Sequence, residues 1–421
     1  MQYSRQERLI AAMLERFPVL KKNIKIFYQK VNYLFYKKKY KFKSDYCINV
    51  IFTKEKESFF GYYDKSPLGV TNKYLIFQVP EENSKYIPNA RNPINIVLHN
   101  VEKDTYDYID KSYSYNWQQG SRLMWLNDFE FIYNSYSNND DCYISKIYNI
   151  ESQAFRIIDF PIYDCYQNKF ALSLNFDRLN VLRPDYGYRN KKDTSIDWSS
   201  DDDGIYFVDL ERNIIRLVIS FQDVIKIHYS SDMDQAKHKF NHIMISPNGK
   251  RFMFLHRWFM GKRKFDSLIV ANIDGSDIQC LSDDGMVSHC FWRGDDHIFG
   301  FLRDSTRGDK YYIINANTGE KNIVGGGLID CFGDGHPHVN GNLVIFDTYP
   351  NKARMKELYI YNFFLNSLHK LGEFYEGFEY QGETRCDLHP RLSSDGKIAY
   401  FDSVHSGKRQ LYSINLKADI Q

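Results

Sequence analysis

From Cys47 onward, short stretches of alternating apolar and polar residues follow one another, separated by turn signals. The segments 252–256 (FMFLH), 343–348 (LVIFDT) and 398–403 (IAYFDS) each follow a turn rich in Gly, Asn, Asp or Ser. Such alternation between such turns predicts strands joined as hairpins. A polar turn also ends the next strand of several units, in the sequences NIDGS, NANTG, NFFLNS and NLKAD. The pattern therefore predicts a series of repeated β-sheet units.

The length of these units, roughly 40–60 residues, suits one four-stranded blade of a β-propeller. We therefore predict an all-β fold, a seven-bladed β-propeller with a short helical N-terminal extension. The expected blades span residues 50–115, 116–167, 168–230, 237–282, 283–328, 329–380 and 381–417. A strand around Cys47–Phe52 is expected to pair with the last blade and close the ring. The polar stretch 190–204 is expected to be a loop.

Residues 1–46 follow a different pattern, and we assign them to a basic helical extension of a propeller that covers residues 47–421. Apolar residues recur at helical spacing with an interruption at Pro18, and a lysine-rich polar face accompanies them. The apolar positions are Leu9, Ile10, Met13, Leu14, Phe17, Ile24, Phe27, Tyr28 and Val31, and the lysines include Lys37, Lys38, Lys39, Lys41 and Lys43. The extension could contact an anionic membrane surface or an acidic partner. Alternatively, it is a solvated helix packed against the flank of the propeller.

Charge and composition narrow the classes of function. Residues 1–44 carry a net charge of +10 and the other 377 residues a net charge of −8, so the basic character is confined to the N-terminal segment. No groove-reading motif follows this segment, and nucleic-acid binding is not expected. The seven cysteines lack CxxC spacing, which argues against a zinc knuckle or a complete disulfide framework. Because charges occupy the N-terminal positions where a signal peptide is apolar, we expect a cytoplasmic protein.

Four histidines lie at nearly the same phase of the repeat. His242, His289, His336 and His389 are separated by 47, 47 and 53 residues. Residues at one phase of successive blades surround a common axis, so these imidazoles are expected to meet in a central funnel. Converging imidazoles can bind a divalent transition metal or an anionic ligand. Alternatively, each histidine caps a strand end and forms a hydrogen bond with a neighbouring blade.

Cationic and aromatic residues form a second group, around a loop shaped by proline and glycine. They are Arg178, Arg183, Tyr186 and Tyr188. Arginine offers a planar fork to a carboxylate or phosphate, and tyrosine can stack on a sugar or act as a general acid. The alternative is a blade-connecting loop with packed tyrosines. The first two blades carry polar and aromatic residues at the phase of the histidines, which favours a polar funnel. These residues are Tyr62, Tyr63, Gln118 and Gln119.

Several common catalytic motifs are absent from the sequence. It contains no GxSxG elbow, no P-loop, no GxGxxG before a helix and no HExxH. No carboxylate pair for glycoside hydrolysis stands out. Asp334 and Asp387 lie close to the phase of the histidines and could be metal ligands or bases, or could orient the imidazoles.

Two segments of the C-terminal half, 240–258 (FNHIMISPNGKRFMFLHRW) and 287–301 (VSHCFWRGDDHIFGF), carry the more specific patterns NH…HxW and SHxxW. With these segments the C-terminal half resembles the oligogalacturonate lyases. Residues 307–320, 333–348 and 389–403 are similar to later blades of that family. The resemblance covers about residues 240–417 and is only general before that.

This resemblance implies a seven-bladed propeller with a manganese-type ion held by His and Gln in the funnel. It also implies β-elimination on uronate-containing oligosaccharides: the metal neutralises the uronate carboxylate, a base removes the C5 proton, and the 4-linked sugar leaves. By position, His289 corresponds to a metal ligand, His336 or His338 to another, and His242 to an active-centre histidine. The chain departs from the family pattern at Cys290, where the family has Glu, and at Arg257.

The family's Gln ligand and arginine base have no clear counterpart in this sequence. Gln118 or Gln119 could supply the amide, and Arg178 or Arg183 could clamp the carboxylate or take the proton. Tyr186 or Tyr63 could protonate the leaving oxygen. The complete expected site comprises catalytic residues Arg183, Arg178, Tyr186 and His242, metal ligands His289, His336, His338 and His389, and substrate-binding residues Tyr62, Tyr63, Gln118, Gln119, Tyr188, Arg257 and Arg391.

Two functions follow as hypotheses. The first is binding of an acidic, uronate-containing oligosaccharide or polysaccharide with cleavage by metal-assisted β-elimination, with Mn²⁺ as the expected metal. The second is a non-catalytic propeller that binds a glycan or a protein in cytoplasmic polysaccharide biosynthesis, because this fold often serves as a binding platform.

Overall fold

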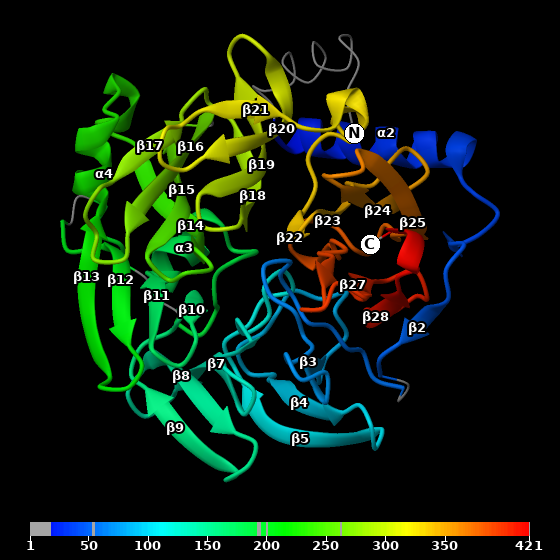
Figure 1. The fold of residues 1–421 in the computed structure, drawn as a ribbon, viewed down its shortest axis with the longest axis horizontal. Helices are drawn as coiled ribbons and strands as arrows, with labels where there is room; N and C mark the ends of the chain where they lie inside the picture. Colours follow the sequence, from blue (N-terminus) through cyan, green and yellow to red (C-terminus); the bar gives the residue numbers. More distant parts are fainter. Residues whose placement is uncertain (1–17, 53–54, 192–194, 199–200, 262, 421) are drawn as a thin grey trace.

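The computed structural model describes residues 18–52, 55–191, 195–198, 201–261 and 263–420. The predicted helical positions Leu9, Ile10, Met13, Leu14 and Phe17 lie outside these residues. Within them, the strands form seven sheets arranged in a ring, which confirms the predicted seven-bladed β-propeller (Figure 1).

Each sheet is one antiparallel blade, and sequence order runs from the innermost strand outward. Blade 1 contains β3 (Tyr74–Pro80), β4 (Ile94–Asn100) and β5 (Thr105–Ser112), and blade 2 contains β6 (Met124–Trp125), β7 (Glu130–Ser137), β8 (Cys142–Asn149) and β9 (Ala154–Ile158). Blade 3 contains β10 (Asp164–Tyr166), β11 (Phe170–Leu174), β12 (Gly204–Asp209) and β13 (Ile214–Ser220), and blade 4 contains β14 (Lys237–Ile245), β15 (Arg251–Met260), β16 (Arg263–Asn272) and β17 (Gln279–Ser282). Blade 5 contains β18 (Val287–Arg293), β19 (His297–Asp304), β20 (Gly308–Asn315) and β21 (Lys321–Ile323). Blade 6 contains β22 (His338–Asn340), β23 (Leu343–Asp347), β24 (Met355–Asn362) and β25 (Ser367–Tyr375), and blade 7 contains β26 (Arg391–Leu392), β27 (Ile398–Ser403) and β28 (Gln410–Asn415).

Two N-terminal strands complete the last two blades. β2 (Ile48–Val50) pairs antiparallel with β28 as the fourth strand of blade 7, as expected for residues 47–52. β1 (Phe42–Lys43) pairs with β25 as a fifth strand of blade 6. Strands from both ends of the chain therefore close the ring.

Buried polar side chains on second strands join successive blades. Asn134 on β7 accepts a hydrogen bond from the N–H of Ile162 (2.7 Å) and donates one to its carbonyl (2.8 Å). Asp402 on β27 accepts from the N–H groups of Phe60 and Gly61, both at 3.1 Å. Each side chain thus satisfies backbone groups in the next blade that would otherwise be unpaired inside the protein.

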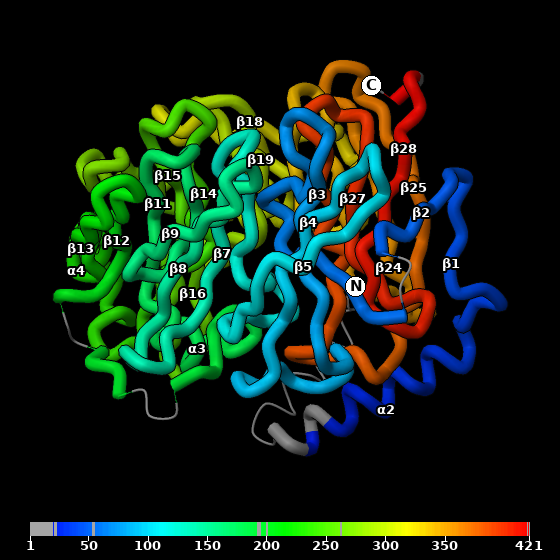
Figure 2. Tube along the Cα trace, turned by 90° about the horizontal axis from the view of Figure 1, so that it is seen from below, coloured from blue at the N-terminus to red at the C-terminus, as the bar shows by residue number. Residues whose placement is uncertain are grey.

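The described chain contains three α-helices and several short 3₁₀ segments. They are α2 (Pro18–Tyr36), α3 (Phe176–Leu182), α4 (Phe221–Ile227) and the 3₁₀ segments Ser231–Met233, Gly325–Gly327, Asp330–Phe332, Gly382–Thr384 and Ala418–Ile420. Figure 2 shows α2 and α3 on the same face of the propeller. The ring of Tyr33 in α2 packs against those of Tyr375 (5.7 Å between centroids) and Phe378 (5.5 Å) beside blade 6.

The prediction of a basic helical extension over residues 1–46 is wrong at its C-terminal end. α2 ends at Tyr36, and its last turn contains no basic residue. The lysines from Lys37 to Lys41 follow the helix, and Lys43 belongs to β1, where pairing with β25 overrides the helical pattern. Among the described residues, no helix is both long enough and apolar enough to span a membrane.

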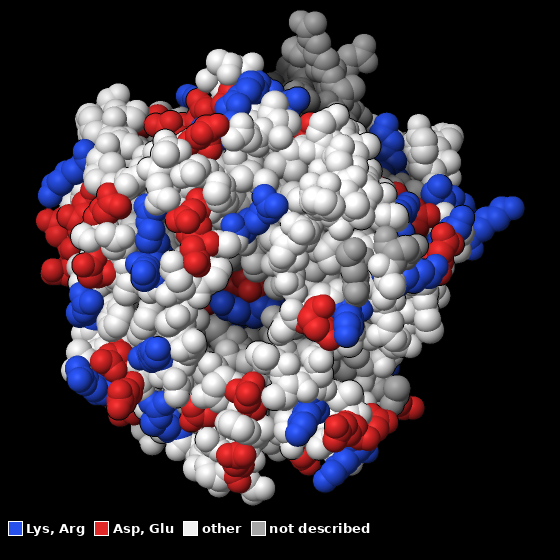
Figure 3. All heavy atoms as spheres, in the orientation of Figure 1, with Lys and Arg blue, Asp and Glu red and all other residues white. Residues whose placement is uncertain are grey.

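The propeller face opposite α2 and α3 is hollowed at its centre. Figure 3 shows this face, with lysine or arginine atoms and acidic atoms visible in the depth of the hollow. Charged groups therefore lie near the propeller axis as well as on the rim.

Candidate functional site

The four histidines predicted from the repeat lie together where blades 4 to 7 meet. Ring centroids are 5.1 Å apart for His242 and His289, 4.2 Å for His289 and His336, and 4.4 Å for His336 and His389. All four residues are buried. The expectation that imidazoles from separate blades converge is thus confirmed, and we call these four residues the axial histidines.

Irregular backbone at the innermost strands sets the direction of the axial histidines. The pairing of β14 with β15 shifts register between Asn241 and Met244, and a similar shift occurs near His289 on β18. His242 and His389 have φ angles of 54° and 42°, a left-handed conformation that costs a non-glycine residue roughly 1–2 kcal/mol. Bulges re-aim side chains at the cost of regular pairing. Backbone strain at two of the four axial histidines is consistent with a functional site rather than with packing alone.

Asp347, the last residue of β23, fixes two axial histidines. Its Oδ1 accepts hydrogen bonds from the backbone N–H and from Nδ1 of His336, both at 2.8 Å. Its Oδ2 accepts from the N–H groups of Leu388 (3.0 Å) and His389 (3.3 Å). His389 donates from Nδ1 to the carbonyl oxygen of Gly61 at 2.9 Å. Because both Nδ1 atoms act as donors, Nε2 of each neutral ring carries the lone pair.

These two Nε2 atoms form the centre of a candidate metal site. Both are buried and have no hydrogen-bond partner in the described part of the chain. His336, His389 and Asp387 offer ligand atoms that all lie within 4.8 Å of one another. Two imidazoles and a carboxylate suit a divalent first-row metal. The carboxylate of Asp347 behind His336 is the usual partner of a ligating imidazole.

Local charges set the protonation of these groups. Burial disfavours charge on Asp387, but Lys356 (2.9 Å) and Arg385 (2.7 Å) hold its pKa well below the usual value. Burial lowers the pKa of His389 well below the usual range, and the neighbouring His336 lowers it further. For His336, burial is outweighed by Asp347, so the pKa is raised. Asp387 is therefore ionised and His389 neutral near pH 7, the states that a metal ligand needs, whereas the raised pKa of His336 means that a metal would have to displace its Nε2 proton.

A cavity of about 540 Å³ reaches this group from the face that carries α2. Its wall includes Lys25 and Gln29 of α2 and, from blade 6 and the following loop, Tyr349, Arg385 and Asp387. Solvent and a small ligand can thus approach Asp387 between the helix and the propeller.

A cluster of cations and aromatic rings borders the axial histidines. Asp185 pairs with the guanidinium groups of both Arg183 (2.9 Å) and Arg385 (2.6 Å). These guanidinium carbons lie 5.1 and 6.0 Å from the ring centroid of Tyr186, which in turn is 5.8 Å from the ring of His242. Planar cations next to tyrosine are suited to an anionic sugar.

Lys239 adds a buried amine to this region. Its residue is 1% exposed, and no hydrogen bond or ion pair joins its amine to another described residue. Burial lowers its pKa well below the usual value, and Arg257 and Arg183 lower it further. Arg257 itself is held by Asp266 at 2.5 Å. The region thus combines fixed positive charge with an amine that tends to be neutral.

Tyr62 and Tyr63 lie inside the arc of axial histidines. The hydroxyl of Tyr62 contacts Nδ1 of His242, and its ring is 5.1 Å from that of His389. The ring of Tyr63 is 5.7 Å from those of both His289 and His336. Burial raises the pKa of both tyrosines well above the usual value, so both hydroxyls stay protonated.

Two predicted ligands have partners outside the His336–Asp387–His389 group. His338 donates from Nδ1 to the carbonyl oxygen of Tyr63 (2.7 Å), and its ring lies 4.6 Å from that of Phe291. His289 approaches Asp334 through Nδ1 at 3.3 Å, and burial lowers its pKa to about 4. His289 remains next to His336, whereas His338 packs behind the tyrosines.

Two predicted arginines lie in interior networks. The guanidinium of Arg178 in α3 donates to Asp203 (2.6 Å) and to the carbonyl oxygens of His238 and Asp197. Arg391 is fully buried and pairs with Asp402 at 2.8 Å. In this arrangement both side chains support backbone and have no free surface for a glycan.

The remaining predicted residues also make internal contacts. Gln118 donates to the carbonyl oxygen of Arg385 at 2.9 Å, and Gln119 donates to the hydroxyl of Tyr163 at 2.8 Å. Tyr188 stacks on Phe176 with centroids 4.5 Å apart. The Oε1 atoms of Gln118 and Gln119 are buried and lack a hydrogen-bond partner among the described residues.

Sequence reasoning missed several members of the site. Asp347 is the fifth residue of the predicted strand LVIFDT, the position that Asp402 occupies in IAYFDS, and this repetition could have indicated a shared role. Lys239 and Arg385 carry no motif, and only the fold brings them to the axial histidines.

Solved structures share the fold of this chain, although no protein-family model and no curated protein sequence matches it. The oligogalacturonate lyase from Vibrio parahaemolyticus is 13% identical, with a TM-score of 0.59 over 90% of this chain and 98% of that one. An oligogalacturonate lyase in complex with manganese is 12% identical, with a TM-score of 0.63 over 90% and 95%. The β-propeller domain of the Trilobed protease from Pyrococcus furiosus is 8% identical, with a TM-score of 0.51 over 87% and 95%. At these identities the similarity shows a common fold.

Proposed function

We propose that the protein binds an acidic, uronate-containing oligosaccharide beside the axial histidines and cleaves it by metal-assisted β-elimination. The observation that carries this proposal is the pair of buried, unpartnered Nε2 atoms of His336 and His389, in two residues that form a close group of possible metal ligands with Asp387. The adjoining arginine cluster supplies the charge that a uronate carboxylate requires. The fold similarity to oligogalacturonate lyases, one of them in complex with manganese, supports the same choice.

Substrate recognition in this proposal depends on the cations around Tyr186. The side chain of Arg183 is 37% exposed and pairs with Asp185, so part of its guanidinium remains open to a carboxylate. Arg385 and Lys356 are held on Asp387 and keep the local potential positive. A sugar ring would lie against Tyr186, which already borders both arginines.

His336, His389 and Asp387 would hold the metal, and we propose Mn²⁺. When bound, such an ion neutralises the uronate carboxylate and makes the C5 proton more acidic. Asp347 keeps the imidazole of His336 in the tautomer that leaves Nε2 available. The carbonyl oxygen of Gly61 does the same for His389, whose backbone N–H Asp347 accepts. The neighbouring His289 can contribute a further imidazole because its ring lies 4.2 Å from that of His336.

His242 and Tyr186 would move the protons. Burial lowers the pKa of His242 well below the usual range, so it is neutral and can accept the C5 proton. The electron pair of the broken C5–H bond forms the C4–C5 double bond, and the C4–O bond breaks. The Tyr186 hydroxyl then donates a proton to the leaving oxygen, since its ring is 5.8 Å from that of His242 on the cationic side of the site. The products are an unsaturated uronate and an alcohol.

The test is the ultraviolet absorbance of the conjugated product, which the saturated substrate lacks. The purified protein is incubated with a panel of acidic oligosaccharides, with Mn²⁺ and with a chelator. We expect Mn²⁺-dependent absorbance that His389→Ala reduces by roughly 100-fold or more, because a lost metal ligand should cost at least as much as a lost hydrogen-bond partner of a ligand. His369→Ala, on the outer strand β25, is the matched control and should keep full activity. Absence of product from every uronate tested would refute the lyase proposal.

A second candidate function is glycan recognition without cleavage. The salt bridges of Asp387 to Lys356 and Arg385 favour it, because these cations already neutralise the carboxylate without a metal. This alternative predicts that the chelated protein binds acidic oligosaccharides as tightly as the Mn²⁺-loaded protein. Calorimetric titration of both forms separates the two functions.

A further inference from the structure

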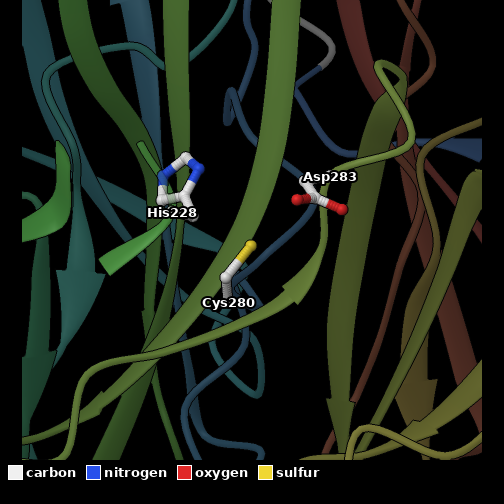
Figure 4. A group of neighbouring side chains, drawn as sticks. All are labelled: His228, Cys280 and Asp283. Atoms are coloured by element: carbon white, nitrogen blue, oxygen red, sulfur yellow. The ribbon is translucent and has the colours of Figure 1, made fainter. Parts of the chain in front are cut away.

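A second group of metal-ligating side chains lies in blade 4, outside the axial histidines. It consists of His228 at the C-cap of α4, Cys280 on the outermost strand β17, and Asp283 just after that strand. Figure 4 shows the three side chains around a shared space. Their ligand atoms all lie within 4.8 Å of one another. Asp283 is exposed, and His228 and Cys280 are half-buried, so an ion can reach the group from solvent.

A chain of imidazoles determines which nitrogen of His228 faces this space. His238 contacts the carbonyl oxygen of Met233 through Nε2 (3.0 Å), and a carbonyl can only accept, so Nε2 of His238 is protonated. Its Nδ1 then accepts from Nε2 of His256 (2.9 Å), and Nδ1 of His256 accepts from Nε2 of His228 (3.1 Å). Each ring fixes the tautomer of the next. Nδ1 of His228 is therefore left with a free lone pair.

Burial keeps this chain neutral. It lowers the pKa of His228 and of His238, and it lowers that of His256 well below the usual range. Burial also raises the pKa of the Cys280 thiol to about 12, so the thiol is protonated at neutral pH. A protonated thiol is a poor nucleophile. In the described chain, moreover, no hydrogen bond joins Cys280 to His228, which argues against a Cys–His catalytic pair.

We propose that His228, Cys280 and Asp283 form a second transition-metal site, with zinc as the preferred ion. One imidazole, one thiolate and one carboxylate are ligands that Zn²⁺ takes in tetrahedral sites, and water can fill the fourth position. At usual zinc bond lengths such ligands lie roughly 3.3–3.8 Å apart, so the group needs to contract by only about 1 Å. Cys280 must release its proton as the ion binds.

The position of this group gives the bound metal a structural consequence. α4 belongs to the connection from blade 3 to blade 4, whereas β17 is the edge strand of blade 4. A metal held by His228 and Cys280 would tie this connection to the edge strand. His256 and His238 would serve as outer partners of the ligating imidazole, as in many metal sites.

Because the proposed ligands include a thiolate, a spectroscopic test can detect metal at this group independently of metal at the axial histidines. Co²⁺ replaces Zn²⁺ in such sites, and a cobalt–thiolate bond produces near-ultraviolet charge-transfer absorbance that imidazole and carboxylate ligands do not. We expect this absorbance on titration of the full-length protein with Co²⁺, and its loss when Zn²⁺ is added. Cys280→Ser should abolish it. Cys331→Ser, at an exposed free cysteine, should leave it unchanged.

Two further variants complete the test. Asp283→Asn should weaken Co²⁺ binding, and His256→Phe should weaken it by about 10–100-fold because it removes the outer partner of His228. His389→Ala should leave the absorbance intact, so a failed lyase assay does not decide this proposal. If Cys280→Ser fails to fold, mass spectrometry of the unmodified protein after alkylation provides a second measurement. Zn²⁺ should protect Cys280 but not Cys331. No thiolate absorbance, or equal alkylation of Cys280 with and without Zn²⁺, would overturn the proposal.

Discussion

At the scale of single residues, Asp347 is the side chain that orders both imidazoles of the candidate metal site without being one of its ligands. One oxygen accepts from His336 and the other from the backbone N–H groups of Leu388 and His389, so one carboxylate positions both histidines. Asp347→Asn should weaken Mn²⁺ binding by about 10–100-fold, because the amide cannot accept at both oxygen positions and Nδ1 of His336 loses its anionic partner. Calorimetric titration with Mn²⁺ measures the effect.

A matched variant separates this effect from a general loss of stability. Asp164 is fully buried, accepts the N–H of Ile245 at 2.7 Å and pairs with Lys65 at 2.5 Å, without contacting an axial histidine. Asp164→Asn should therefore destabilise the fold yet retain Mn²⁺ affinity. Equal loss of affinity in both variants would mean that Asp347 has no specific role at the metal.

The sequence predicted the histidines of the site better than their surroundings. The axial histidines share a phase of the repeat, and the propeller geometry converts that phase into proximity. Lys239 and Arg385 could not be found in this way, because they reach the site from a strand and an irregular loop with no common register. Arg178 was proposed for the site because of its side-chain chemistry alone. In the structure its guanidinium donates to Asp203 inside the protein.

At the scale of elements, ring closure depends on the short pairing of β2 with β28. The N–H of Ile51, just after β2, donates to the carbonyl oxygen of Leu411 at 3.0 Å. Ile51→Pro removes this donor and should lower the free energy of unfolding by about 1–3 kcal/mol more than Ile51→Ala, which keeps the N–H. Urea unfolding of both variants checks this. Equal destabilisation would indicate that the side chain, not the closing hydrogen bond, stabilises the seam.

Strands were easier to predict than helices in this chain. Alternating apolar and polar residues and glycine-containing turns repeat in every C-terminal blade. Strands recognised in one blade therefore strengthen the prediction of strands in the next. α3 and α4 are seven residues each, too short for a helical period to emerge. The sequence features that mark these two helices are their N-terminal capping residues. The side chain of Asn175 accepts from the N–H of Arg178, and Ser220 forms a capping box with Asp223. The end of α2 was missed because strand pairing by β1 is a long-range effect.

At the scale of the whole molecule, buried imidazoles should make the propeller sensitive to acid. Burial lowers the pKa of His405 to about 4, and its ring lies between those of Phe42, Phe374 and Tyr412. The unfolded chain takes up a proton near pH 6.5, whereas the folded chain resists it down to about pH 4. This contribution to stability is complete above pH 6.5 and is lost as the pH falls through that window. Burial also lowers the pKa of His338 to about 4, so its contribution to stability is lost over the same pH range.

Urea unfolding of the chelated protein between pH 7 and pH 4.5 measures this contribution. Each imidazole that stays neutral in the fold should lower the free energy of unfolding by about 1.4 kcal/mol per pH unit below pH 6.5. His405→Gln should make the dependence of unfolding free energy on pH shallower by about that amount, because it removes one proton-binding group from the unfolded chain. This change in slope is expected whatever the variant does to stability at pH 7. His369→Gln is the control, since this side chain is half-buried on an outer strand and not enclosed by aromatic rings. If both variants keep the wild-type slope, His405 does not couple protonation to unfolding, and acid sensitivity must come from other blades.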